Sequence, residues 1–323
     1  MKLKRSSFLI LLAGSLIHFT SCTNSSIPER SLEMASDVNT LIQAESMNDM
    51  ALHLADVYVN FLETIKNNDP KDTIYNLPNG AYLQVDIDGV IVRIKKEERS
   101  LHPRNIFIDF GTGVNLRLGN VFKGQIHVRE TAAMSETNAK RTYVFSNLEL
   151  NGHTIKGTNT RTYLGVNSDL QPMWKIDSND SITFQDGRTL RWNAERTLTR
   201  VNVPSSAKPT DFDENVIDSI RYDATQQVSE KMKSMMLWDQ LYSVYGVSNG
   251  VNADGKAFTT RILEGYPLHI GMGFPCYISG KCLLKEDKDL LMLDFGNKKR
   301  DFLLTITLHG LSLEYDSLDG NVK

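Results

Sequence analysis

The first long stretch with a regular hydrophobic pattern runs from Ser31 to Asn67, and the pattern is helical. Apolar residues recur mostly at steps of three and four, and neither glycine nor proline interrupts them. These positions are Met50, Leu52, Leu54, Val57, Val59, Phe61, Leu62 and Ile65. A polar run that closes with Pro70 ends the pattern. We therefore expect one helical segment over residues 31–69.

After this segment the chain changes to short runs in which apolar and polar residues alternate. Such alternation places every second side chain on one face of a strand. The clearest runs are 82–87, 105–110, 124–129 and 142–145. Asn151-Gly152 and Asp186-Gly187 lie between runs, where type I′ hairpin turns need two residues with positive φ. Because no helical crossovers separate the runs, we predict a mainly β fold of antiparallel meander sheets, as a curved sheet or a sandwich.

A change of composition divides this β-rich region. Residues 204–214 contain two prolines and two serines and end in an acidic run, which is typical of a linker. The division gives one β-rich half over 70–203 and a second over 215–323.

One short sequence occurs in both halves. Ile-Phe-Ile-Asp-Phe-Gly at 106–111 resembles Leu-Met-Leu-Asp-Phe-Gly at 291–296. A protein kinase is excluded, because no glycine-rich loop, strand lysine or catalytic loop accompanies either copy. The favoured interpretation is a strand with an inward phenylalanine, ended by a turn that Asp and Gly shape. The alternative is that Asp109 and Asp294 bind a cation such as Ca²⁺.

The N-terminus has the pattern of an export signal. Basic residues precede an apolar run of eleven residues, 6–16, which is shorter than the about 20 residues of a spanning helix. We expect residues 1–21 to be a signal peptide that is removed. Phe19–Cys22 is similar to the lipobox of bacterial lipoproteins, with Phe19 in place of an aliphatic residue. An ordinary secreted protein with an incidental thiol is the alternative.

The lipobox resemblance implies that Cys22 is diacylated and becomes the new N-terminus. Residues 22–30 then form a lipidated tether, and the acyl chains hold the protein on a membrane without a protein span. We expect an anchor in the outer membrane. Residues 23–26 contain no acidic run, which favours the periplasmic face over the cell surface.

Overall composition excludes some partners. Hydrophobic residues make up 41% and charged residues 23% of the chain, as in ordinary globular proteins, and the net charge is −3. Nucleic-acid binding is not expected, because there is no basic surplus for phosphates.

Cys276 and Cys282 are the remaining cysteines, and a disulfide between them requires a turn at Ser279-Gly280. Two separate buried thiols are the alternative.

Catalytic motifs are weak in this sequence. Gly-Val-Ser-Asn-Gly at 246–250 fits the nucleophile elbow of α/β-hydrolases, with Ser248, Asp294 and His309 in the matching chain order. An elbow needs a helix after the serine, but residues 251–255 read as a second turn. No histidine lies in a zinc-binding spacing, and no cofactor motif is present. The 39 acidic residues offer too many pairs to identify a glycosidase.

Aromatic residues offer a possible sugar-stacking platform, although such residues also pack in cores. They are Trp174, Trp192, Trp238, Tyr242 and Tyr245.

Ten short sequences together carry a resemblance to a known family. They lie at 108–113, 122–126, 145–147, 151–152, 155–158, 181–184, 186–189, 250–258, 279–281 and 293–296. Together they resemble uncharacterised lipoproteins of Gram-negative gut anaerobes. The resemblance covers roughly residues 80–315 and implies export, lipidation and a β-rich body, without an activity. Family members carry cysteines after each Asp-Phe-Gly, where this chain has Val114 and Lys298-Lys299, so no disulfide is carried over.

Four Asp-Ser/Thr-Ile/Leu sequences resemble the O-glycosylation signal of such bacteria, with Thr73 and Ser219 as the better candidates.

The sequence therefore favours a membrane-anchored envelope lipoprotein that acts as a binding or structural module with a glycan or protein partner. No metal or cofactor is expected. The alternative is an envelope hydrolase, either a glycosidase or an esterase.

Overall fold

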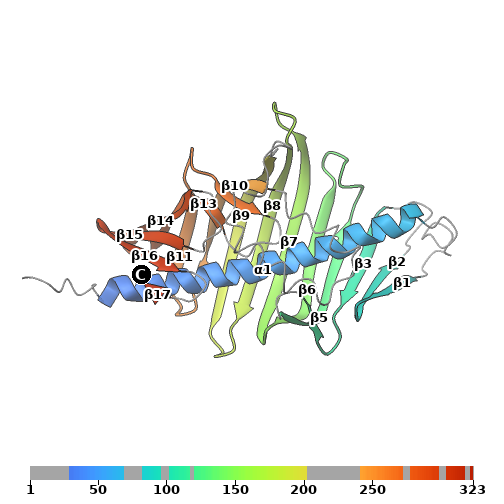
Figure 1. The fold of residues 1–323 in the computed structure, drawn as a ribbon, viewed down its shortest axis with the longest axis horizontal. Coiled ribbons are helices and arrows are strands. Elements are labelled where there is room, and N and C mark those ends of the chain that lie inside the picture. Colours follow the sequence, from blue (N-terminus) through green and yellow to red (C-terminus); the bar gives the residue numbers. More distant parts are fainter. Residues whose placement is uncertain are drawn as a thin grey trace, which may run out of the picture.

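The fold is one long helix that lies across one face of a single antiparallel sheet (Figure 1). The computed structural model describes residues 29–68, 82–95, 102–116, 120–201, 241–271, 277–297, 303–316 and 321–322. In chain order its elements are α1 (Glu29–Asn68), β1 (Tyr82–Ile87), β2 (Val90–Lys95), β3 (Arg104–Asp109), β4 (Val114–Asn115), β5 (Val121–Glu130), β6 (Lys140–Leu150), β7 (His153–Val166), β8 (Pro172–Thr183), β9 (Thr189–Val201), β10 (Leu241–Val251), β11 (Ala257–Ile262), β12 (Leu268–Gly271), β13 (Tyr277–Glu286), β14 (Asp289–Asn297), β15 (Leu303–Leu308), β16 (Leu311–Asp316) and β17 (Asn321–Val322). The prediction of a mainly β fold with one N-terminal helical segment is confirmed.

Helix α1 closely matches the predicted segment. Its 40 residues correspond to a length of about 60 Å. Its N-terminal end is ion-paired with Lys256 between β10 and β11, and its other end lies near β3 (Figure 1). Small side chains such as Ala44, Ala51 and Ala55 are fully buried along it, which lets the helix lie close to the sheet. No helix in the described residues combines the length and the apolar composition that a membrane span requires.

The strands follow one another through the sheet in chain order, as a meander does. At two places in this order, two short strands share one neighbour: β3 and β4 both pair with β5, and β11 and β12 both pair with β13. Strands β9 and β10 pair along the whole of β10, so the two predicted halves belong to one sheet. The predicted linker 204–214 lies outside the described residues.

The two Asp-Phe-Gly copies have the same local structure. Asp109 accepts a hydrogen bond from the backbone N–H of Gly111 at 2.9 Å, and Asp294 accepts one from Gly296 at 3.0 Å. The phenylalanine between them is buried in both copies. The first copy agrees with the interpretation of a strand whose Asp and Gly shape its end, because β3 ends at Asp109. The second copy does not end its strand, because β14 continues to Asn297 and its register against β13 shifts at this point.

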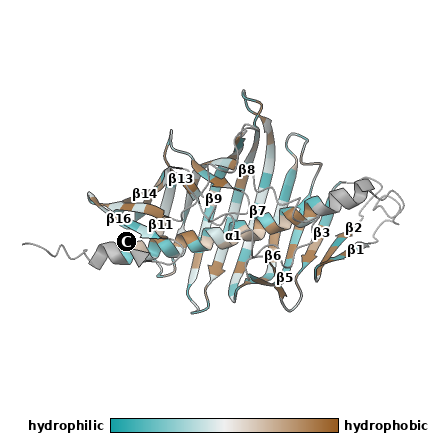
Figure 2. Ribbon diagram, viewed as in Figure 1, coloured by the Kyte–Doolittle hydropathy of each residue, from teal (hydrophilic) through white to brown (hydrophobic). Residues whose placement is uncertain are grey.

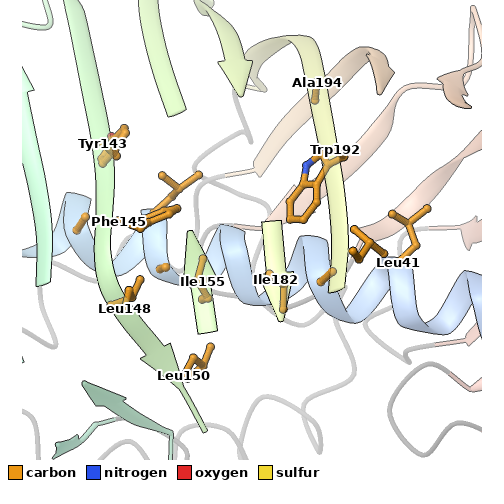
Figure 3. Close-up of a cluster of buried hydrophobic side chains, with 14 of the residues drawn as sticks. Leu41, Tyr143, Phe145, Leu148, Leu150, Ile155, Ile182, Trp192 and Ala194 are labelled. Atoms are coloured by element: carbon orange, nitrogen blue, oxygen red, sulfur yellow. The ribbon is translucent and has the colours of Figure 1, made fainter. Parts of the chain in front are cut away.

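The core lies between α1 and the face of the sheet turned towards it, which we call the inner face. Hydropathy alternates along the strands (Figure 2), and strands such as β2 and β3 alternate buried with partly exposed residues. Full burial of one large apolar side chain contributes about 1.5–3 kcal/mol. Part of this core is shown in Figure 3, where the labelled side chains are Leu41, Tyr143, Phe145, Leu148, Leu150, Ile155, Ile182, Trp192 and Ala194.

The two predicted hairpin turns differ in geometry. Asn151 and Gly152 have φ values of 51° and 81°, as a type I′ turn requires. In the β8–β9 loop only Gly187 has a positive φ, of 86°. The type I′ prediction for Asp186-Gly187 is therefore wrong. The ladder there ends where Thr183 pairs with Thr189, so a longer loop joins the two strands.

Glycines permit irregularities inside the sheet. At Gly124, whose φ is +83°, the register between β5 and β6 shifts. A Cβ atom on this glycine would overlap the backbone carbonyl of Asn147. Such bulges bend a strand and increase its twist.

This close approach predicts a stability difference between two glycines of similar φ. Gly124→Ala combines left-handed backbone strain with steric overlap, so we expect a loss of about 2–4 kcal/mol in the free energy of unfolding. Gly187→Ala has nothing within 4 Å of the new Cβ and carries the strain alone, about 1–2 kcal/mol. Urea unfolding of both variants measures the difference. Equal losses would show that the overlap at Gly124 relaxes freely.

Candidate functional site

Ion pairs, most of them buried, run along the contact between α1 and the inner face, and we call them the charged seam. Acidic side chains of the helix meet basic side chains of the sheet. The pairs are Glu33 and Asp37 with Lys256, Glu45 with Arg196, and Asp56 with Arg141 and Arg161. These pairs are hard to predict from sequence, because acidic residues within a helical pattern are usually assigned to the solvent face of the helix.

Asp56 occupies the most densely bonded part of the charged seam. Its Oδ1 atom accepts hydrogen bonds from Arg141 Nη1 at 2.6 Å and from the Tyr143 hydroxyl, and its Oδ2 atom accepts one from Arg161. Burial alone would raise the pKa of Asp56, but the two arginines and Tyr143 stabilise the carboxylate and hold the pKa below its usual value. Asp56 is therefore charged at neutral pH.

Glu130 on β5 extends this network away from the helix. Its carboxylate is almost fully buried and accepts hydrogen bonds from Arg141 Nε at 2.6 Å and from Arg104. Burial opposes ionisation, but the bond with His102 and the charges of the two arginines hold the pKa of Glu130 well below its usual range. Arg141 thus joins two buried carboxylates.

At the other end of α1, Lys256 lies beside three carboxylates. Its Nζ atom is 2.6 Å from Glu33 Oε1, 3.0 Å from Asp37 Oδ2 and 3.5 Å from Glu286 Oε1. These bonds raise the pKa of Lys256. The ammonium group thus forms ion pairs with two carboxylates of the first turns of α1 and one carboxylate of the sheet.

A different kind of carboxyl group lies under the middle of α1. Asp180 is 2% exposed and accepts hydrogen bonds from Asn159 Nδ2 at 2.9 Å and from Asn48 Nδ2 at 3.3 Å. Burial raises the pKa of Asp180 to about 8, and the neighbouring Asp49 adds to the shift. Burial also raises the pKa of Asp49 to about 6. Asp180 therefore carries a proton at neutral pH.

The predicted esterase serine does not lie on a nucleophile elbow. Residues 246–250 all belong to strand β10, whereas an elbow is a turn between a strand and a helix. Ser248 is fully buried on the inner face, and its hydroxyl bonds with Thr260.

Its two proposed partners have other contacts. Asp294 Oδ2 lies 2.7 Å from Lys281 Nζ, between β13 and β14. His309 is exposed in the β15–β16 turn, with Nε2 3.6 Å from Asp289 Oδ1. The sequence order Ser, Asp, His therefore does not correspond to a set of side chains that bond with one another.

The cation alternative for the two Asp-Phe-Gly copies finds no support in the described residues. Asp109 lies on β3 and pairs with Arg93 at 3.4 Å, while Asp294 lies on β14 and pairs with Lys281. Within the described part of the chain, no three His, Cys, Asp or Glu side chains are grouped so that they hold a metal ion.

Several predicted residues lie outside the described part of the chain and stay predictions. They are Cys22, Thr73, Ser219, Trp238 and Cys276. Cys282 is described as a free, buried thiol, so the structure gives no support to a disulfide with Cys276. Burial raises the pKa of the Cys282 thiol to about 12, which makes it unreactive at neutral pH.

The predicted aromatic residues do not form one platform. Trp174 lies 5.9 Å from Tyr242 and 5.7 Å from Tyr163 between ring centroids, on the inner face. Trp192 is buried in the core. Tyr245 follows the buried Val244 on β10 and therefore points to the opposite face of the sheet.

That opposite face, which we call the outer face, carries five exposed polar side chains in register on adjacent strands. We call them the amide row: Thr158, Asn179, Asn193, Asn249 and Thr259. None of these side chains makes a hydrogen bond to another group in the described part of the chain. The neighbours of each along its strand point to the inner face. The row was missed from sequence because only the pairing of β7 to β11 aligns its members.

The raised pKa of Asp180 predicts a pH-dependent stability. An ordinary Asp has a pKa of about 4, so the folded protein keeps a proton that the unfolded chain loses between about pH 4 and 8. The free energy of unfolding should therefore fall as pH rises from about 5 to 8, with a slope approaching 1.4 kcal/mol per pH unit. Asp180→Asn should remove most of this slope in urea titrations.

A matched control is Asp177→Asn, which changes an exposed carboxylate on the outer face of the same strand. This variant should keep the slope of the unchanged protein. Below about pH 6 the raised pKa of Asp49 contributes a slope of its own. A slope between about pH 6.5 and 8 that survives in Asp180→Asn would show that Asp180 is ionised at neutral pH.

Known proteins do not supply a function for this chain. No family model, no curated protein and no solved structure matches it. Two features of the fold therefore bear on function: the charged seam, which covers the middle of the inner face, and the outer face, which carries the amide row.

Proposed function

We propose that this protein is a membrane-anchored envelope lipoprotein that works as a binding or structural module and meets its partner through the outer face. The observation that carries this proposal is the contrast between the two faces of the sheet. Helix α1 and the charged seam cover the middle of the inner face, while polar side chains of the central strands are exposed on the outer face. A sheet face of this size is suited to an extended partner.

The positions of the catalytic candidates make a hydrolase the weaker hypothesis. Ser248 lies under α1, whereas His309 lies in an exposed turn. Asp180 has a raised pKa, as a catalytic acid often has, but it is 2% exposed and bonded to two asparagines. A substrate would have to displace α1 to reach it.

The order of the chain indicates which end of the sheet the anchor holds. Cys22 precedes the start of α1 at Glu29 by seven residues, which span at most about 25 Å. The first turns of α1 are ion-paired with Lys256 in the β10–β11 turn, beside Glu286 of β13. A lipid on Cys22 would hold this end near the membrane and let the other end, with β1 to β3, extend away from it.

The anchor is tested by changing the cysteine. Native protein should fractionate with membranes and carry the mass of acyl chains, and Cys22→Ala should become soluble and lack this mass. Cys282→Ala is the matched control and should stay with the membrane. Soluble, unacylated native protein would refute the anchor.

The outer face is tested by photo-crosslinking in cells that naturally make the protein. A photoreactive residue at Asn193 on the outer face should give adducts, and one at Gln43 on the solvent side of α1 should not. Gel shift and mass spectrometry detect the adducts. Adducts from Gln43 alone would move the binding surface to the helix.

A further inference from the structure

We propose that the amide row, together with two basic residues beside it, binds an acidic glycan, that is, a hydroxyl-rich chain that carries carboxylates. This inference rests on the proposed function, because it names the ligand of the same outer face. The arrangement that carries it is the register of Asn179 and Asn193 on β8 and β9, with Lys156 and Arg191 one step further along the same face.

The asparagines of the amide row have no structural task in the described part of the chain. Other asparagines do: Asn151 accepts a hydrogen bond from a neighbouring strand, and Asn159 binds a buried carboxyl group. Asn179, Asn193 and Asn249 make no such bonds. Asparagine is also unfavourable within strands. These three asparagines lie in strands, where asparagine is disfavoured, and no hydrogen bond to the described residues compensates for this. Residues with an unfavourable local preference and no structural compensation are typical of binding sites.

Two basic side chains border the amide row. Lys156 and Arg191 are both exposed and lie in register across Ser181 of β8. Neither makes an ion pair within the part of the chain that the structure describes. Their positive charges are therefore available to an anionic group on a ligand.

The opposite border of the row is almost balanced in charge. Asp177 and Glu195 pair across β8 and β9, and Lys175 Nζ lies 3.0 Å and 3.1 Å from their carboxylates. Arg261 is exposed on the same border, in register with Glu195 across Val247 of β10. The outer face around the row is therefore basic along one side and close to neutral along the other. A chain with carboxylates along one edge matches this one-sided distribution, whereas a polymer charged along both edges would find unbalanced positive charge along one side only.

The row matches the chemistry and the length of such a chain. An asparagine amide both donates and accepts hydrogen bonds, as a sugar hydroxyl does, and lysine and arginine form charge-assisted bonds with carboxylates. Neighbouring strands are about 4.8 Å apart, so five strands give a row about 19 Å long. That length fits several linked sugars rather than one small molecule.

The test measures binding of hexagalacturonate and a hyaluronan hexamer to the acylated protein in detergent micelles. The fully methyl-esterified hexagalacturonate is the matched uncharged probe, and inorganic polyphosphate is the control for simple charge attraction. Isothermal titration at low and high salt should give binding of at least one acidic hexamer. The ester should bind at least about tenfold more weakly than its acid.

Two sets of substitutions separate the amides from the charges. A triple variant with Asn179→Val, Asn193→Val and Asn249→Val should weaken binding by at least about tenfold and leave the salt dependence unchanged. Valine is favourable in strands, so the free energy of unfolding should not fall. The pair Lys156→Gln and Arg191→Gln should remove the preference for the acid over the ester and most of the salt dependence.

The matched control is the pair Thr183→Val and Thr189→Val, on the same two strands and face but outside the row, and it should leave binding unchanged. Absence of binding to both acidic hexamers overturns the inference. Equal binding of acid and ester overturns it too, as does polyphosphate binding that the triple variant does not affect. If adducts still form at Asn193 in cells, the proposed function survives such a result; if they do not, both fail.

Discussion

The structure depends on the charged seam between α1 and the sheet. A wide sheet needs a cover on one face, and a single long helix with small apolar side chains would slide along it if only apolar contacts held it. Ion pairs oppose this sliding, since Asp56 meets Arg141 and Arg161, and Lys256 meets Glu33 and Asp37, in one position of the helix. Such pairs are costly to desolvate, so they contribute more to a unique position of α1 than to net stability.

The glycines of the central strands make room for the inner-face side chains near α1. Gly157 pairs with Asp180, Gly246 with Arg196, and Gly250 with Trp192. In each pair a Cβ atom on the glycine would overlap the backbone or side chain of its partner. Small residues therefore lie opposite large or charged ones, which is how the inner face holds polar groups such as Asp180 in a packed layer.

The same strands give the two faces different properties, because consecutive side chains point to opposite sides. Asp180, Ala194 and Ser248 lie under α1, and the residue beside each of them belongs to the amide row. A shift of register by one residue would bury the row and expose the groups that bond with the helix. The inner face therefore fixes the register, and the outer face is free to bind a partner because it has no part in packing.

The sequence by itself determined the local structure: the uninterrupted apolar steps of α1, the alternation of the strands, the antiparallel order and the turn at Asn151-Gly152. Each depends on residues that are close in the chain, where periodicity and backbone preference are sufficient. Only the tertiary structure decided which distant side chains meet. Asp56 bonds with Arg161, 105 residues further along, and the amide row exists only because five strands pair in one register. Electrostatic and hydrogen-bond partners are set by this pairing, and no spacing in the chain encodes them.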